Sequence, residues 1–223
     1  VKLHNKYGNI ATSDLFSDAE IKCKYGKIAL GRLSGNSSNI LVEYCSNSTI
    51  SFLKNATVTA KYSNLKIGEV AKLDLASDYT DVDIQESDVV KYISKYGNIK
   101  IQNVKSLDAT GNYLTLKIGE ISNNLKLSTK YSNVTIGTIN AKANTVTIAA
   151  GYTGLNIGFD ANYAFDFNVT VKYANFKYDN ELEVNSKEDS NNLKKYSGFY
   201  KKRGVNNVSI ISDYGNVILV KKQ

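Results

Sequence analysis

The chain has 223 residues, of which 42% are hydrophobic, so it can bury a sizeable core and does not have the composition of a disordered chain. It contains no Pro, and this suits a chain of paired strands, because proline cannot donate to a strand ladder. The formal net charge of +7 comes mostly from lysine, since Arg32 and Arg203 are the only arginines.

The positive charge has two interpretations: a lysine-studded soluble surface, or attraction to an anionic partner such as an acidic glycan or a lipid head group. Nucleic acid is not expected as a partner, because arginine supplies most bidentate phosphate and base contacts. No apolar run approaches the roughly 20 residues that span a bilayer, so no transmembrane segment is predicted. The chain does not begin with Met, which suggests either a removed export signal or a trimmed chain.

A short repeat organises the sequence. Residues 61–68 read KYSNLKIG, and close copies return at 95–101 (KYGNIKI) and 130–137 (KYSNVTIG). Weaker copies start at Tyr7, Tyr25, Tyr44, Tyr79, Tyr113, Tyr152, Tyr173 and Tyr214. The step between successive tyrosines is 17 to 19 residues as far as Tyr131 and then widens. A fixed short period is the signature of a repeat architecture.

Each copy can be numbered from its tyrosine as position 0. Position +1 is usually small and position +2 is often asparagine, as in Gly97 and Asn98. Because both residue types tolerate positive φ, the pair predicts a tight turn at these positions. Positions +3 and +5 are aliphatic, as in Leu65 and Ile67, and alternation with period two predicts a strand with one buried face.

One such coil cannot bury its apolar face alone, so the repeats are expected to stack and to pair every strand with its neighbours. The predicted fold class is all-β: a single-stranded parallel β-helix (β-solenoid) with coils of about 17–21 residues, forming one domain over 1–223. The handedness of parallel crossovers favours a right-handed β-helix. A left-handed β-helix is the alternative, because a coil of eighteen residues also fits that fold.

Charged side chains support the stacking, because residues at one position of successive coils become cross-strand neighbours. Position −1 runs Lys24, Glu43, Lys61, Asp78, Lys95, Asn112 and Lys130, and position +4 runs Lys66, Asp83 and Lys100. Opposite charges therefore alternate from coil to coil at two positions of the repeat. The tyrosines themselves are expected to stack in a partly exposed column, which would serve as a stabilising ladder or as a platform for sugar rings.

The copies change in character along the chain. Residues 1–60 carry degraded copies, and 61–139 form the regular part. Around 140–178 the coils lengthen and the predicted core becomes aromatic, with Phe159, Phe165, Phe167, Phe176 and Tyr178. The stretch 181–204 breaks the pattern and is expected to be an irregular loop or a cap over the open end of the stack. A last copy at 213–220 closes the chain.

Within the 181–204 stretch, basic and aromatic residues are interleaved, which also fits a binding loop for an anionic or sugar ligand. The candidate ligand-binding residues are Lys195, Tyr196, Phe199, Tyr200, Lys202 and Arg203.

Acidic residues crowd one coil, and β-helical proteins that cleave polysaccharides use paired carboxylates. Asp78, Asp81 and Asp83 are therefore the candidate catalytic residues, although their positions also suit a solvated face paired with lysine. No metal-binding spacing and no phosphate-binding loop is present, so neither a metal site nor a cofactor is predicted.

Two cysteines, Cys23 and Cys45, lie about one repeat apart but out of register with each other. Thiols on neighbouring coils can bridge in an oxidising compartment, so a disulfide is one possibility. Buried, inert thiols are the favoured interpretation.

The phrases at 5–10 (NKYGNI), 95–101 and 212–217 (SDYGNV) resemble the adhesin-head-like family of exported β-helical proteins found in Bacteroides-type bacteria. The resemblance covers nearly the whole chain. It implies a mostly right-handed β-helix and a location at the cell surface, in the periplasm or outside the cell. It supplies no functional residues, because the family has no defined site that matches this chain.

The expected function is that of a non-enzymatic, exported cell-surface or envelope protein: an adhesin that binds a glycan or another anionic surface ligand. A polysaccharide-active enzyme, a pectinase-like hydrolase or lyase on the same scaffold, is the alternative, and it would use the three aspartates. An architectural envelope protein is the second alternative.

Overall fold

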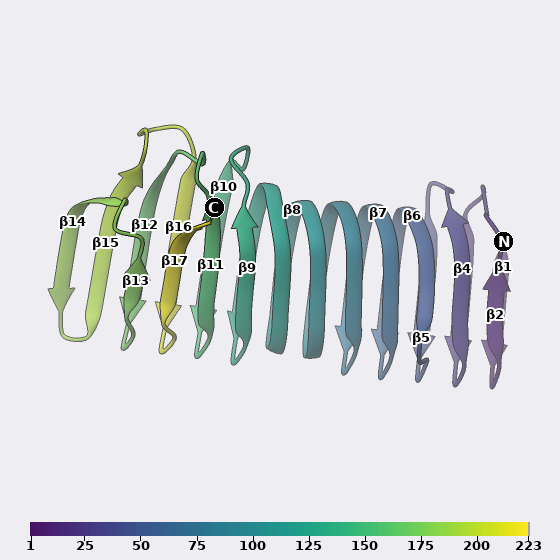
Figure 1. Ribbon diagram of the computed structural model, residues 1–223. Coiled ribbons are helices and arrows are strands. Elements are labelled where there is room, and N and C mark those ends of the chain that lie inside the picture. Colours follow the sequence, from purple (N-terminus) through teal and green to yellow (C-terminus); the bar gives the residue numbers. More distant parts are fainter. Residues whose placement is uncertain (223) are drawn as a thin grey trace. The chain divides into compact units, whose positions relative to one another are not determined.

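A computed structural model describes residues 1–222 and confirms the predicted fold class. About 76% of the chain is strand, residues 1–222 contain no helix, and the strands stack as parallel coils in a β-solenoid of about 9 turns (Figure 1). No helix able to cross a membrane therefore occurs in this part of the chain. The handedness of the coils stays a prediction.

The chain divides into two compact units, Val1–Val104 (unit 1) and Lys105–Gln223 (unit 2). The strands of unit 1 are β1 (Lys2–Lys6), β2 (Asn9–Thr12), β3 (Ala19–Lys24), β4 (Lys27–Leu33), β5 (Ser38–Glu43), β6 (Ser48–Lys61) and β7 (Asn64–Asp78). Strand β8 (Asp81–Lys130) begins in unit 1 and ends in unit 2. Unit 2 continues with β9 (Asn133–Ile139), β10 (Thr145–Gly151), β11 (Gly154–Asp160), β12 (Phe165–Lys172), β13 (Phe176–Tyr178), β14 (Glu183–Ser190), β15 (Leu193–Tyr200), β16 (Asn207–Asp213) and β17 (Val217–Lys222).

The aliphatic positions of the repeat form the core, as predicted. In unit 1, Leu65 is paired with Val82 and Ile67 with Ile84, and all four side chains are buried. Between β7 and β8 the register advances by one whole repeat, so position +3 lies on position +3. The Tyr44 copy has one extra residue after its tyrosine, so Ser48 at position +4 pairs with Leu65 at position +3. Stacking thus converts a period-two pattern into continuous apolar columns.

The corner before these residues differs from the sequence prediction. The tyrosine itself adopts positive φ in all eleven copies, with values between 49° and 65°, whereas Gly97 and Asn98 do not. This conformation is unfavourable for a residue with a side chain, by roughly 1–2 kcal/mol each. Each coil offsets this cost with contacts to its neighbours, such as the Tyr62 N–H, which donates to the Asp78 carbonyl at 3.0 Å.

Position +1 is small because two backbones approach each other there, and not because φ is positive. A Cβ added to Gly97 would lie 2.1 Å from the Thr80 carbonyl oxygen of the preceding coil. Where position +1 carries a hydroxyl, the hydroxyl bridges the coils instead. The Thr80 hydroxyl accepts from the Ser63 N–H at 3.3 Å and donates to the Asp78 carbonyl at 2.9 Å.

The tyrosines form the predicted column of rings. In unit 1 the ring centroids of neighbours from Tyr7 to Tyr96 lie 4.6 to 5.2 Å apart, with interplanar angles of 5° to 15°. The rings stay partly exposed; Tyr62, for example, is 50% exposed. Because each inner ring face is covered by the next tyrosine, only ring edges and hydroxyls meet solvent. This geometry fits a stabilising ladder and leaves no free face within the column on which a sugar could stack.

The alternating charges are cross-strand neighbours, as expected. Lys24 is opposite Glu43, with 3.1 Å between the amine and the carboxylate, and Lys100 is 3.5 Å from Asp83. Exposed pairs of this kind contribute little each, about 0–1 kcal/mol, but they disfavour a shift of register.

In unit 2 the coil that comes last in the sequence does not lie at the end of the stack. Strand β16 lies between β10 and β12, and β17 lies between β11 and β13 (Figure 1). The C-terminal copy is therefore inserted between two coils that precede it in sequence. The tyrosine stack follows the same order, since Tyr214 stacks on both Tyr152 and Tyr173.

Of the two alternatives for the stretch 181–204, an irregular loop or a cap, the hairpin formed by β14 and β15 fits the cap. Strand β15 runs antiparallel to β12, and β14 runs antiparallel to β15, so the hairpin covers the free edge of β12 (Figure 1). Most of β14 is exposed and carries charged side chains such as Lys187, Glu188 and Asp189. Charges on an outer strand discourage pairing with other chains. The predicted aromatic core lies beneath it: Phe159, Phe165, Phe167 and Phe176 are buried, whereas Tyr178, also predicted for the core, is only half-buried.

Both cysteines are buried free thiols, which confirms the favoured interpretation. The Cys45 thiol donates to the Cys23 carbonyl at 3.3 Å. Burial raises the pKa of the Cys23 thiol to about 11, so this thiol stays protonated and unreactive at neutral pH.

Tyr92 is a buried polar residue at a position that neighbouring coils fill with aliphatic side chains. It is 2% exposed, is paired with Leu75, and among residues 1–222 its hydroxyl has no hydrogen-bond partner. Leaving such a group unsatisfied costs about 1–3 kcal/mol. We therefore expect Tyr92→Phe to increase the free energy of unfolding by about 1 kcal/mol in urea titrations. A loss of stability would show instead that the hydroxyl is satisfied, for example by a buried water.

Candidate binding groove

The strand that precedes each tyrosine directs alternate side chains outward, and positions −3 and −1 stand side by side on every coil. In unit 1 position −3 is occupied by His4, Lys22, Leu41, Thr59, Ala76 and Ile93, and position −1 by Lys6, Lys24, Glu43, Lys61, Asp78 and Lys95. Because the register is constant, each position forms a column that crosses the strands. Hollows beside these columns can therefore follow one another across the strands.

Three hollows follow this surface. The first, of about 330 Å³, lies over β1, β3 and β5, and the second, of about 200 Å³, lies over the ends of β6 and β7 and over residues 91–95 of β8. The third, of about 210 Å³, lies on the other side of position −3, beside Asn39 and Thr57, and shares Lys22 and Leu41 with the first hollow and Thr59 with the second. The three hollows adjoin one another along the −3 column, and we call them together the outer groove. It crosses six strands, or roughly 24 Å at about 4.8 Å per strand.

The wall of the outer groove is low where small side chains replace long ones. Thr59 and Ala76 occupy position −3 in the middle of the groove, between the larger Leu41 and Ile93. The lining therefore mixes apolar atoms with a hydroxyl, while the −1 column adds charged groups at the side. A surface of this kind suits a ligand that is itself both apolar and hydroxylated.

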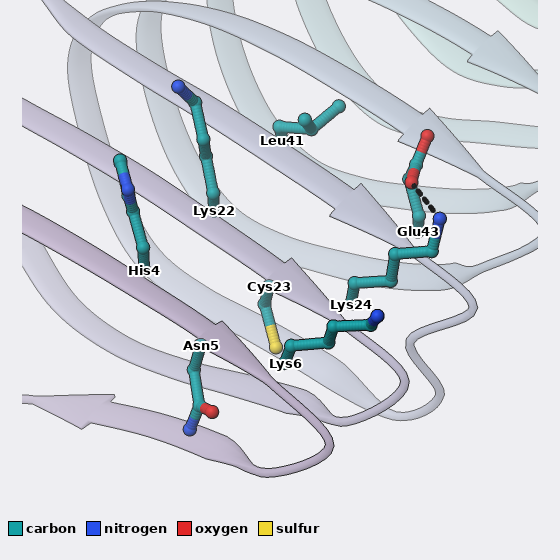
Figure 2. Close-up of a pocket in the computed structure, with 8 residues that line it drawn as sticks. All are labelled: His4, Asn5, Lys6, Lys22, Cys23, Lys24, Leu41 and Glu43. Carbon is teal, nitrogen blue, oxygen red and sulfur yellow. Dashed lines mark ion pairs between the residues drawn. The ribbon is translucent and has the colours of Figure 1, made fainter.

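The first hollow is the most strongly charged part of the outer groove. Figure 2 shows the side chains of Lys6 and Lys24 extending in the same direction, on the side of Glu43, whose carboxylate pairs with Lys24. The Lys6 ammonium lies over the Tyr7 ring, 4.9 Å from its centroid. His4 and Lys22 line the other side of the hollow.

Glu20 anchors the basic residues beside this hollow. Its carboxylate lies 2.6 Å from the Lys22 amine, 2.9 Å from His4 Nε2 and 3.6 Å from the Lys2 amine. The hydrogen bonds from Lys22 and, next, from His4 lower the pKa of Glu20 from 4.5 to about 2. The carboxylate thus stays ionised and holds the cations in place over the whole physiological pH range.

The lowered pKa of Glu20 predicts how the stability of the protein changes in acid. Because the folded-state pKa of Glu20 is depressed, its stabilising effect is complete above pH 4.5 and is lost as the pH falls from about 4.5 to about 2. We expect an NMR titration of the Glu20 carboxyl to give a midpoint near 2. The Glu20→Gln variant should show a weaker fall in stability over that window than the parent, and an equal fall would contradict the assignment.

The structure separates the three candidate catalytic aspartates. Asp78 lines the outer groove, whereas Asp81 and Asp83 follow the Tyr79 corner on β8. Their oxygens bind the neighbouring coil: Asp81 accepts from the backbone N–H and the side-chain amide of Asn98, at 2.9 and 2.8 Å. Asp83 pairs with Lys100. These contacts are those of a cross-strand ladder, and neither Asp81 nor Asp83 lines the hollow that Asp78 lines.

The candidate ligand-binding residues of the hairpin fall into two groups. Tyr196 and Tyr200 are buried, with Tyr196 packed against Phe176 and the Tyr200 hydroxyl donating to the Ala161 carbonyl at 3.1 Å. A ligand could reach these rings only if the hairpin opened.

The remaining hairpin residues lie at the surface. The Lys195 amine lies 3.1 Å from Glu188, and the Arg203 guanidinium lies over the Phe199 ring and donates to Asn185. Lys202 is exposed. A binding role for this set stays a prediction.

Sequence reasoning missed the outer groove, although a signal was present. Two successive residues at position −3, Thr59 and Ala76, are smaller than Leu41 and Ile93 on either side of them in the same column. Reading that column would have indicated a depression along the stack. The charged −1 column was recognised, but only as support for the stacking of the coils.

Residues 1–222 hold no cluster of three or more His, Cys, Asp or Glu side chains that could bind a metal ion. Comparison of the chain with protein-family models, with curated proteins and with solved structures finds no match to any of them.

Proposed function

We propose that this chain is a non-enzymatic, exported surface protein, an adhesin that binds an extended glycan along the outer groove of unit 1. The observation that carries the proposal is the row of three adjoining hollows across six successive strands. A compact ligand would need one closed pocket, whereas a shallow channel of this length suits a linear polymer. The family resemblance adds the location at the cell surface and the adhesive role.

The repeat of the scaffold supports a glycan in particular. Strands follow each other at about 4.8 Å, which is close to the length of one pyranose unit in an extended glycan. Successive sugars would therefore meet equivalent positions on successive coils. The apolar atoms of Leu41, Ala76 and Ile93 can contact the C–H faces of the rings, and the hydroxyl of Thr59 can bond to sugar hydroxyls.

The test is a glycan array probed with the full chain, followed by affinity measurements on the glycans that bind. Ala76→Tyr fills the middle of the outer groove with a large outward side chain and is expected to weaken binding at least tenfold. Ala11→Tyr, on the exposed face of β2 outside the groove, is the matched control and should bind as the parent does.

Two results would overturn the proposal. One is a parent protein that binds no glycan on the array, and the other is an Ala76→Tyr variant that binds with unchanged affinity. Turnover of any bound glycan by the parent chain would favour the polysaccharide-active alternative instead.

A further inference from the structure

We infer that the hollow over β1, β3 and β5 is a subsite for a single anionic group of an otherwise neutral glycan, with Lys6 as its main cation. This inference rests on the proposed function, because it assigns one part of the ligand to one end of the outer groove. It is argued from the distribution of charge along the groove, which is uneven.

The first two coils of the groove carry an excess of positive charge. Lys6, Lys22 and Lys24 line the first hollow, together with His4 and one carboxylate, Glu43. Lys22 is engaged by Glu20 and Lys24 by Glu43. Lys6 differs from both: among residues 1–222 its ammonium pairs with no carboxylate and only covers the Tyr7 ring. It can therefore take an anionic ligand group without giving up an ion pair.

Further along the groove the charge alternates. The −1 column continues with Glu43, Lys61, Asp78 and Lys95, so every second coil presents a carboxylate. A polymer with an acid on every sugar would place like charges against Glu43 and Asp78, which is unfavourable. A glycan with one acidic sugar at the Lys6 end and neutral sugars beyond it meets no such repulsion.

The anionic group is a carboxylate, sulfate or phosphate monoester, because all three accept hydrogen bonds from an ammonium group. The strands set the position of the acid: it must be the sugar over β1 and β3, and the neutral sugars must extend toward β7 and β8. The site thus predicts both a composition and a direction for the bound chain.

The experiment compares three oligosaccharides of equal length by calorimetry with the full chain: neutral, with one terminal uronic acid, and with uronic acid at every position. We expect the singly acidic oligosaccharide to bind about tenfold more tightly than either of the others, and added salt to reduce that preference. Lys6→Gln should abolish the preference, so that the variant binds the singly acidic and the neutral oligosaccharides with equal affinity. Lys27→Gln, at an exposed position on β4 outside the groove, is the matched control.

The outcomes separate the two proposals. If no oligosaccharide binds, the proposed function fails. If the neutral and singly acidic oligosaccharides bind equally, or if Lys6→Gln keeps the preference, this inference fails while the proposed function stands. Tighter binding of the fully acidic oligosaccharide or of single-stranded nucleic acid would also overturn it, because either result would mean that the alternating carboxylates do not select the ligand.

Free sulfate and a phosphorylated sugar, added as competitors, show whether the subsite needs the attached glycan. Displacement of the oligosaccharide by free sulfate alone at equal concentration would contradict a glycan subsite.

Discussion

Replacing Gly97 by alanine is expected to lower the free energy of unfolding by about 3 kcal/mol, because the new methyl group has no space. Its Cβ would lie 2.1 Å from the Thr80 carbonyl oxygen, and a backbone atom cannot move aside as the end of a flexible side chain can. The coils would have to separate at this corner, which would also weaken the hydrogen bond from the Thr80 N–H to the Tyr96 carbonyl, now 3.2 Å.

Two further variants make this prediction specific. Gly97→Ser should lose less stability than Gly97→Ala, because a hydroxyl at position +1 can accept the neighbouring N–H, as the Thr80 hydroxyl does for Ser63. Gly154→Ala is the control, since its Cβ would meet only the Asn133 side-chain oxygen at 3.8 Å. Urea titrations measure all three, and equal stabilities for Gly97→Ala and Gly154→Ala would refute the close-approach explanation.

Ile67→Ala is expected to lower the free energy of unfolding of unit 1 by about 3 kcal/mol. This is within the range measured when a buried aliphatic side chain is shortened and a cavity remains. Ile67 is 1% exposed and lies between Ile50 and Ile84 of the two flanking coils. Its loss therefore weakens contacts with both neighbours, and in a stacked repeat these contacts supply most of the stability.

The neighbouring residue provides the control for this variant. Lys66 points outward from the same strand, and Lys66→Ala should change the free energy of unfolding by no more than about 0.5–1 kcal/mol. A cost for Lys66→Ala equal to that for Ile67→Ala, measured by the same denaturant titration, would mean that the side chains do not alternate between core and solvent.

The corner shows where sequence reasoning chose the wrong residue for a correct turn. The preference of Gly and Asn for positive φ predicted the turn at the two residues after the tyrosine. The tyrosine itself adopts positive φ in every copy. The usual preferences describe isolated turns. Here the ring gains stacking contacts on both faces, as between Tyr62 and its neighbours Tyr44 and Tyr79, and those contacts depend on neighbouring coils that local propensity ignores.

The candidate site shows a similar limit. The sequence directed attention to charged and aromatic clusters such as Asp81 and Tyr200, but one is held by Asn98 of the next coil and the other is buried in the core. The outer groove depends on small residues between larger ones, as at Thr59 and Ala76, and a shallow channel appears only when successive coils are placed in register.

The sequence by itself determined the stacking of the coils. A period-two pattern such as Leu65 and Ile67, repeated every 17 to 19 residues with alternating charges, buries its apolar side chains in only one register. The tertiary structure alone decided the order of the last coils. Because Val208 and Ile210 have the same alternation as every other copy, they can pair with any free strand edge. They lie between β10 and β12 because the hairpin of β14 and β15 covers the other edge of β12.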